Sequence, residues 1–205
     1  MFQSLIVLDD VLPDAMRVRD AALKLDYPEP GPGAHYPGRN SATSLRLPEL
    51  DAQISAIVGE TLVPGTPDHG RFRITRAGEQ SDLDIHVDQC HWSGIFYLTR
   101  PEDCQGGTDF FRHKGTGADH APYSQKHLSD WGFASYREFV ERVSKPHSRD
   151  RSQWDHLMRV PMKFNRLVLF RPWLWHTAGP AFGDCPENAR LIYLMFFNSE
   201  GPLRT

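Results

Sequence analysis

A short polar stretch, DIHVDQCHW at residues 84–92, gathers side-chain types that bind metal ions. Asp84, His86 and Asp88 alternate along it, and His91 follows just beyond. Alternate side chains of a β-strand point to the same face, so His86 and Asp88 would lie roughly 6–7 Å apart along one side. The pair can therefore chelate one ion, although the same tripeptide is also typical of a solvated strand edge.

A second histidine from a distant strand would complete such a site. His176 is the best placed, because it follows the apolar segment RLVLF (166–170) after a short turn. Two imidazoles and one carboxylate form a facial set, and the open positions opposite it let non-haem Fe(II) hold a co-substrate and dioxygen together. The ligand types therefore indicate iron and oxygen chemistry. The plain alternative for His176 is a buried histidine bonded to backbone.

Two neighbouring polar residues compete for the same role. Asp84 shares the face of His86 one strand step earlier, and we expect it beside the ligands or exposed to solvent. His91 breaks the alternation, so we expect it to be on the surface or to support the ligands. Neither is predicted to bind the ion.

Composition limits the classes of protein that the chain can represent. Its 205 residues are 40% hydrophobic and 24% charged, with a formal net charge of -3, which predicts one globular domain over 1–205 and favours neither nucleic acid nor an anionic membrane as partner. The only apolar run near the start is Leu5–Leu8, so we expect no signal peptide, no membrane span and a cytoplasmic protein. Cys90, Cys104 and Cys185 lack CxxC spacing and are predicted to be free thiols.

The elements that position the polar residues can be outlined from the sequence. A strand at 5–8 and a helix over about 13–24 precede a loop at 27–39 that is rich in proline and glycine and could serve as a lid. A helix is expected at 48–58, and a strand follows within 71–78.

Short strands then follow in quick succession. We expect them at 83–88, 94–99 and 108–111, and the turn residues between them favour an antiparallel sheet. Residues 112–160 read as a helical insertion, with Tyr136, Phe139, Val140 and Val143 on one helical face. The last strands are expected at 166–170 and 190–197. The pattern predicts an α+β domain, mainly β, built on a β-sandwich or barrel.

Four segments together resemble the Fe(II)- and 2-oxoglutarate-dependent dioxygenases of the prolyl-hydroxylase-like group. They are TRAGEQSDLDIHVD (75–88), WSGIFYLTRPEDCQGGTDFF (92–111), NRLVLFRPWLWHTAGP (165–180) and RLIYLMFF (190–197). They occur in the order of that family and cover roughly the C-terminal two thirds of the chain apart from the insertion. With YPGRNS near the front, the chain is similar to a bacterial branch of the superfamily.

This resemblance implies a fold and a site. The fold is a double-stranded β-helix, the cupin-like jelly-roll, preceded by N-terminal helices. The site consists of Fe(II) held by His86, Asp88 and His176. Arg190 would pair with the distal carboxylate of 2-oxoglutarate, because a planar guanidinium clamps a carboxylate through two hydrogen bonds. Tyr97 matches a position whose hydroxyl often helps to bind the same co-substrate.

The resemblance also implies an activity. Asp88 is present where halogenating relatives carry a small residue, which favours hydroxylation of an unactivated C–H bond with dioxygen. Thr75 stands where the family commonly carries a tyrosine, so the co-substrate contacts beyond Arg190 stay open. A small-molecule or peptidic substrate suits a partly aromatic pocket better than a nucleic acid does. Arg39 in the 27–39 loop is a candidate substrate contact.

Aromatic residues near the ligands and two other functions stay open. Trp92, Trp173 and Trp175 are either core residues or walls of a substrate pocket. A cupin-like metalloenzyme that does not use 2-oxoglutarate would use the same ligands, and a non-catalytic jelly-roll binding protein would keep them without turnover. The sequence leaves the oligomeric state undecided, with a homodimer as one option.

Overall fold

The structure is a computed structural model that describes residues 3–31 and 35–200, so 32–34 of the predicted 27–39 loop lie outside the described residues. It contains a seven-stranded and a three-stranded sheet, both antiparallel, with helices outside them. The strands of the large sheet are, in spatial order, β1 (Leu5–Leu8), β8 (Arg166–Phe170), β5 (Trp92–Tyr97), β10 (Arg190–Ser199), β4 (Phe72–Thr75) and β2 (Arg39–Asn40), with β3 (Leu62–Pro64) against β10. The small sheet has the order β7 (Trp154–Pro161), β6 (Gly107–His113) and β9 (His176–Thr177).

Strict alternation along β10 divides the two faces of the large sheet. Leu191, Tyr193, Met195 and Phe197 join the cluster on the outer face, whereas Ile192 and Leu194 join the cluster that faces the small sheet. Successive side chains of a strand point to opposite faces, so the apolar residues of β10 contribute to a cluster on each side of the sheet. The expectation of a mainly β protein with a few helices is confirmed.

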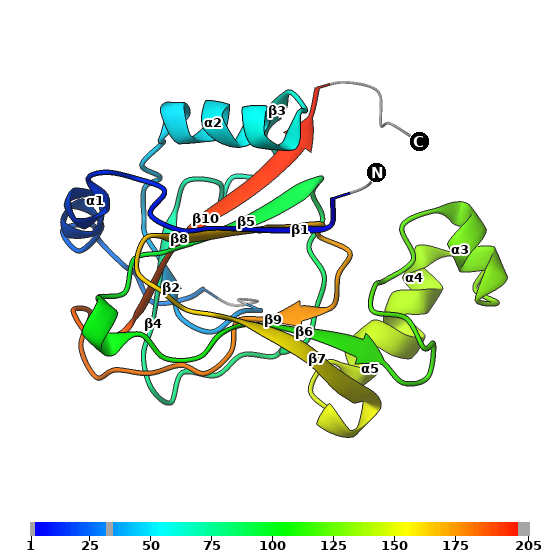
Figure 1. Cartoon of the computed structure of the whole chain (residues 1–205). Helices are drawn as coiled ribbons and strands as arrows, with labels where there is room; N and C mark the ends of the chain where they lie inside the picture. The colour runs from blue at the N-terminus through cyan, green and yellow to red at the C-terminus, as the bar shows by residue number, and fades with distance from the viewer. Residues whose placement is uncertain (1–2, 32–34, 201–205) are drawn as a thin grey trace.

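Two helices cover the outer face of the large sheet (Figure 1). Helix α1 (Ala15–Ala22) buries Ala15 and Ala22, and α2 (Pro48–Val58) buries Leu50 and Ile54. Helix α2 begins with proline at its first turn and ends at Gly59, which has a left-handed φ of 69°. The sequence predicted α2 with its bounds, whereas α1 is shorter at both ends than the predicted 13–24.

The small sheet faces the inner surface of the large sheet, and apolar side chains fill the space between them (Figure 1). Phe110 and Val160 come from the small sheet, and Tyr97, Val168 and Phe170 come from the large one. Each buried aromatic or aliphatic side chain contributes about 1.5–3 kcal/mol through its removal from water. The shared cluster therefore holds the two sheets together around the polar residues at one end.

The segment between β6 and β7 departs from its prediction at both ends. Its middle is helical, with α3 (Gln125–Asp130), α4 (Tyr136–Phe139), the π-helical turn η2 (Val140–Ser144) and α5 (Lys145–His147). The 3-10 turn η3 (Arg151–Gln153) follows directly before β7, and a second 3-10 turn, η1 (Pro101–Asp103), lies between β5 and β6. The helical prediction for 112–160 is wrong where β6 extends to His113 and where β7 occupies Trp154–Pro161. Strand β7 was missed because five consecutive residues inside it are exposed, which hides the alternation.

Other strand bounds shift by a few residues, and one predicted strand is absent. Residues 83–88 form no strand in the described structure, because within them only His86 forms a ladder bridge, with His176. Ser148 holds the segment instead, since its hydroxyl accepts from the Asp84 N–H and its carbonyl accepts from the Ile85 N–H. Within the part of the chain that the structure describes, no helix is long and apolar enough to cross a membrane.

Candidate metal centre

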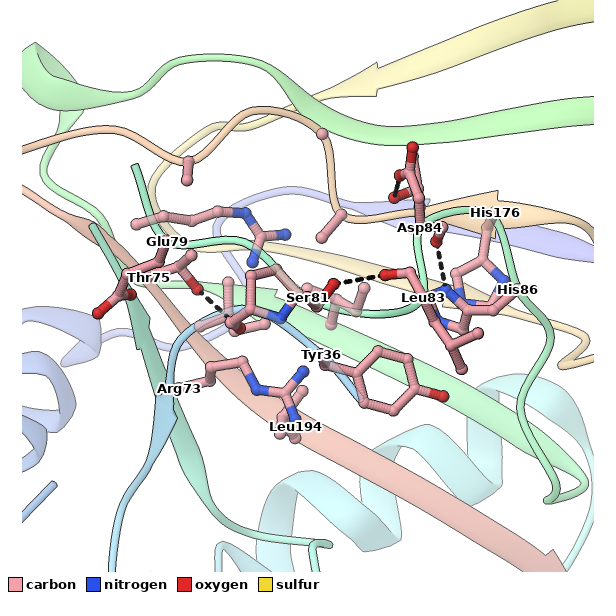
Figure 2. A pocket seen from close by; sticks show the side chains of 18 of the residues that line it. Tyr36, Arg73, Thr75, Glu79, Ser81, Leu83, Asp84, His86, His176 and Leu194 are labelled. Carbon is pink, nitrogen blue, oxygen red and sulfur yellow. Dashed lines mark hydrogen bonds between the residues drawn. The ribbon is translucent and has the colours of Figure 1, made fainter. Parts of the chain in front are cut away.

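A cavity of about 380 Å³ lies against the inner face of the large sheet, and Figure 2 shows it at close range. Strand β4 contributes Arg73 and Thr75, and β10 contributes Arg190, Ile192, Leu194 and Phe196. Strand β9 contributes His176 and Thr177. Segments between the strands complete the lining, with Tyr36, Leu83, Asp84, His86 and Asp88 before β5 and Ala178 and Gly179 after β9. Its volume falls at the lower end of the range for small-molecule sites, about 300–1,000 Å³.

The structure brings His86, Asp88 and His176 together at one end of this cavity. One ligand atom from each residue lies within 4.8 Å of the others. The Nε2 atom of His86 lies 3.8 Å from Asp88 Oδ1, and that of His176 lies 3.5 Å from Asp88 Oδ2. Two imidazole nitrogens and a carboxylate at this spacing can hold one divalent transition-metal ion.

The backbone aims both imidazoles. His86 and His176 exchange N–H···O=C bonds of 3.0 Å in both directions, which sets their rings 4.3 Å apart. The Nδ1–H of His86 donates to the Asp84 carbonyl at 2.8 Å, and that of His176 donates to the Leu174 carbonyl at 2.8 Å. Both Nε2 atoms are therefore left for a metal, because the hydrogen bond at Nδ1 fixes the tautomer and the ring orientation.

The carboxylate of Asp88 is held just as firmly. The Ser93 hydroxyl donates to Asp88 Oδ2 at 2.6 Å, and the Asp88 N–H donates to the Pro172 carbonyl at 3.0 Å. Ser93 lies on the inner face of β5, between Trp92 and Gly94, and is 1% exposed. A single serine thus fixes one carboxylate oxygen.

Electrostatics favours the protonation states that a metal needs. Burial, and then the nearby His176, lower the pKa of His86 from 6.5 to about 4, so this imidazole is neutral at physiological pH. Burial would raise the pKa of Asp88, but His176, His86 and the Ser93 hydroxyl outweigh it and keep that pKa below its ordinary value. A neutral imidazole and an ionised carboxylate are the ligand forms of these residues.

Asp84 supports the metal cluster, as one of its two predicted roles required, whereas His91 lies away from the cluster and is partly buried. The Asp84 carboxylate accepts from the Thr177 hydroxyl at 2.7 Å and pairs with Arg151 at 2.8 Å, while its carbonyl orients His86. His91 faces away from the cavity and contacts Glu60 and Arg171. Among the described residues neither belongs to the metal cluster.

Arg190 lines the same cavity and has an unusual environment. It is 1% exposed, and its Nε and Nη2 atoms have no hydrogen-bond partner among the residues that the structure describes. Burial lowers its pKa from 12.5 to about 10. A buried guanidinium without an anion is costly, so this side chain is ready to bind an anionic group that enters the cavity.

Tyr97 lies beside Arg190 rather than on the cavity wall. The Arg190 guanidinium carbon is 6.0 Å from the centre of the Tyr97 ring, and the Tyr97 hydroxyl shares a hydrogen bond of 2.6 Å with Thr108. A direct contact between its hydroxyl and a co-substrate therefore stays a prediction.

Other residues that the sequence singled out do not line this cavity. Trp92 and Trp175 are fully buried, Trp173 contacts Tyr123 instead, and none of the three lines the cavity. Arg39 pairs with Glu29 at 2.9 Å and borders a smaller cavity next to the main one. The three cysteines are free thiols, as predicted.

Sequence reasoning missed Tyr36, Arg73 and Ser93. In FRIT the apolar Phe72 and Ile74 face outward into the core, so the alternation places Arg73 on the inner face with the metal residues. That arginine inside an otherwise apolar strand was the available signal. Nothing local marks Tyr36 or Ser93, because their roles depend on contacts across the fold.

Several solved structures have the same fold as this chain. HygX from Streptomyces hygroscopicus, solved with nickel, 2-oxoglutarate and hygromycin B, is 15% identical with a TM-score of 0.54, over 96% of this chain and 83% of that one. The non-haem α-ketoglutarate-dependent epimerase SnoN from nogalamycin biosynthesis is 13% identical with a TM-score of 0.54, over 95% and 78%. AviO1 from Streptomyces viridochromogenes is 15% identical with a TM-score of 0.51, over 98% and 90%. At these identities the likeness shows a shared fold.

Sequence comparison gives a family without an activity. No curated protein matches the chain. A family model matches residues 2–197, which is nearly the whole sequence and includes each of the cavity residues described above. The chain therefore belongs to DUF6445, a family of unknown function.

Proposed function

We propose that the chain is a non-haem Fe(II)- and 2-oxoglutarate-dependent oxygenase that uses dioxygen to hydroxylate an unactivated C–H bond of a small-molecule or peptidic substrate. One observation carries the proposal: a two-histidine, one-carboxylate cluster lines the same cavity as the buried Arg190, whose Nε and Nη2 have no hydrogen-bond partner in the described part of the chain. A metal and a carboxylate would satisfy both. 2-Oxoglutarate is an acid that can chelate the metal through its keto acid end and still present a second carboxylate.

His86, Asp88 and His176 are the proposed iron ligands. Each imidazole presents Nε2 because its Nδ1–H is already donated to a carbonyl, and Ser93 keeps Asp88 in place. When bound, Fe(II) and 2-oxoglutarate would let dioxygen act as the oxidant, and the chain would supply binding and orientation. Three protein ligands would leave further coordination positions of a bound Fe(II) for the co-substrate and dioxygen.

Arg190 is the proposed partner of the distal carboxylate of 2-oxoglutarate. Its Nε and Nη2 atoms lie on one edge of the guanidinium and lack partners, so they can donate in parallel to two carboxylate oxygens. Tyr97 packs against Arg190 and would position it, with its own hydroxyl held by Thr108. HygX, which was solved with nickel and 2-oxoglutarate bound, is a precedent on the same fold.

The arrangement of the sheets supports the double-stranded β-helix as the finer description of the fold. Two antiparallel sheets face each other over a shared apolar cluster, and the cavity lies at one end of it. Hydroxylation is the proposed outcome because Asp88 is present at the metal. The epimerase SnoN shares the fold, so an oxidative outcome other than hydroxylation is the main competitor on the same cofactors.

Anaerobic titration of the Fe(II)-loaded protein with 2-oxoglutarate tests the proposal. Chelation produces a visible metal-to-ligand charge-transfer band, which we expect in the wild type. The band should be lost in His86→Ala and should need far more 2-oxoglutarate in Arg190→Leu. Arg137→Leu, on the exposed surface of α4, removes the same charge away from the cavity and should titrate like the wild type.

Each failure of this titration has a defined meaning. Tight metal binding without a band would contradict the use of 2-oxoglutarate and favour a cupin-like metalloenzyme. An absence of metal binding would favour a non-catalytic binding protein. A band that Arg190→Leu leaves unchanged would remove Arg190 from the co-substrate site.

A further inference from the structure

The cavity contains a second arginine that the proposed function does not use. Arg73 lies opposite Ile192 in the pairing of β4 with β10, whereas Arg190 lies opposite Thr75. The two arginines therefore start two residues apart on neighbouring strands of the same inner face. The positive charge of Arg73 adds to the burial that lowers the pKa of Arg190. The two guanidinium groups therefore repel each other when no anionic ligand is bound.

The guanidinium of Arg73 is only partly occupied. Its Nε–H donates to Asn40 Oδ1 at 2.7 Å, and no other hydrogen bond of this guanidinium occurs among the described residues. The side chain lines the cavity and is half-buried rather than sealed. Its terminal nitrogens are therefore available to a molecule in the cavity.

Arg73 lies at the metal end of the cavity, where the ring of Tyr36 separates it from the proposed metal ligand His86. Its guanidinium carbon is 5.3 Å from the centre of the Tyr36 ring, and that ring is 4.7 Å from the imidazole of His86 (Figure 2). A group bound by Arg73 would thus lie beside the metal and Tyr36.

Gly38 fixes the Tyr36 loop in this position. It has a φ of +90°, and a Cβ atom there would lie 2.4 Å from Thr75 Oγ1 and 2.5 Å from the Ile74 carbonyl. The loop can approach β4 so closely only because this residue is glycine. The Tyr36 ring is consequently held between Arg73 and His86 before any substrate arrives.

We propose that Arg73 binds a carboxylate of the primary substrate, which makes that substrate a small organic acid. The inference rests on the proposed function and adds the substrate class to it. A planar, singly charged carboxylate matches the free edge of a guanidinium. A doubly charged phosphate fits less well, because Asp68, Glu79 and Asp84 also line the cavity. The volume of about 380 Å³, shared with 2-oxoglutarate, excludes a polymer from the interior.

The test uses simple acids as probes of the Arg73 site. The anaerobic complex of the protein with Fe(II) and 2-oxoglutarate is titrated with straight-chain monocarboxylates from formate to hexanoate, and separately with the primary amides of the same acids. Binding beside the metal shifts the charge-transfer band. We expect a saturable shift with at least one acid and none with its amide at the same concentration.

Variants separate the two arginines. Arg73→Gln should weaken acid binding by about tenfold or more, because it removes a charge-assisted pair. Its 2-oxoglutarate midpoint should change far less than that of Arg190→Leu, because the proposed partner of the distal carboxylate, Arg190, is still present. Arg73→Lys, which keeps the charge, should restore part of the acid response, and Arg137→Gln should behave like the wild type. The intact 2-oxoglutarate titration shows that each variant is folded.

Three results would overturn the inference while leaving the proposed function intact. They are a wild-type protein that forms the band but responds to none of the acids, amides that bind as well as acids, and an Arg73→Gln variant that requires more 2-oxoglutarate in the manner of Arg190→Leu. In the third case Arg73 would belong to the co-substrate site. A wild-type protein that forms no band would remove both proposals.

Discussion

The two ends of the cavity differ in how their polar atoms are satisfied. At the metal end, the Nδ1 atoms of His86 and His176 donate to carbonyls, and Asp88 accepts from Ser93. At the other end, two guanidinium nitrogens of Arg190 have no hydrogen-bond partner within residues 3–31 and 35–200, although the side chain is 1% exposed. One end is oriented by the chain itself, and the other depends on a ligand.

This difference predicts which end of the cavity determines metal affinity and which end lowers the stability of the ligand-free protein. Orienting hydrogen bonds behind metal ligands raise affinity because the chain has already ordered the side chains. An unpaired buried cation lowers the stability of the ligand-free fold, and a matching anion restores it. We therefore expect substitutions at the metal end to lower metal affinity. Substitutions at the arginine end should weaken ligand binding and raise the stability of the ligand-free protein.

The largest effect is expected when a ligand of the metal end is removed. Asp88→Ala leaves two imidazoles, so Fe(II) affinity should fall by more than the ~10–100-fold that loss of a supporting hydrogen bond causes. Competition with a metal indicator under anaerobic conditions measures this affinity. Asp82→Ala removes an exposed carboxylate nearby and should have no effect. An Asp88→Ala protein with wild-type affinity would show that Asp88 is not a ligand.

The second-largest effect is expected from replacement of Arg190. It should raise the free energy of unfolding of the ligand-free protein and lower that of the protein with 2-oxoglutarate. Below its folded-state pKa of about 10, Arg190 stays charged inside the fold, and burial of that charge destabilises the ligand-free protein at neutral pH. Arg190→Met should therefore raise the unfolding free energy of the ligand-free protein by about 1–4 kcal/mol. It should also abolish the stabilisation by 2-oxoglutarate, which is about 2.7 kcal/mol in the wild type at a hundredfold excess over Kd.

Thermal unfolding of the metal-loaded proteins with and without 2-oxoglutarate tests this. Arg190→Met should unfold at a higher temperature than the wild type without 2-oxoglutarate and at a lower one with it. Arg112→Met, an exposed arginine of β6, serves as the control for loss of one charge. If Arg190→Met destabilised the ligand-free protein, the guanidinium would have a structural partner in solution. The contrast between the two ends of the cavity would then be wrong.

A third effect concerns pH and the neutral state of the metal end. The pKa of His86 falls from 6.5 in the unfolded chain to about 4 in the fold, so the unfolded chain takes up the proton first as pH falls. The wild type without metal should thus lose stability between pH 6.5 and 4, by on the order of 3 kcal/mol from this group. His86→Gln should reduce that loss, as measured by urea unfolding at several pH values.

His113 provides a matched comparison far from the metal. Burial, and then the neighbouring His147, lower its pKa to about 4 as well. His113→Gln should therefore reduce the acid sensitivity by a similar amount. Only His86→Gln should abolish the additional stability that a bound metal provides, so equal metal responses of the two variants would contradict the proposed ligand set.

Much of the fold could be predicted from the sequence where local patterns agree with burial. The bounds of β1, α2 and β8 were predicted correctly, because apolar runs and helix-end residues mark them directly. The metal residues were predicted from their types and from the resemblance. The strand predicted at 83–88 is absent from the described structure, and a single bridge from His86 to His176 takes its place. His86 and Asp88 nevertheless lie close together, as the alternation predicted.

The rest could not be predicted because it depends on contacts between distant segments. The exposed middle of β7 shows no alternation, and its pairing with β6 defines it instead. Tyr36 reaches the metal end through the close approach of Gly38 to β4. Such contacts join residues that have no common local pattern, so propensity and periodicity carry no information about them.

The smallest expected effect comes from one such contact. Ser93→Ala removes the hydroxyl that donates to Asp88 Oδ2 at 2.6 Å, and the carboxylate keeps its other contacts. Fe(II) affinity should fall by about tenfold, at the lower limit for a supporting hydrogen bond. Metal titration of Ser93→Ala beside Ser152→Ala, an exposed serine, measures the difference. Ser93→Thr keeps a hydroxyl and should recover part of the affinity. If Ser93→Ala bound metal like the wild type, the metal end would owe its order to the His86–His176 backbone bridge alone, and the carboxylate would be free to turn toward the ion.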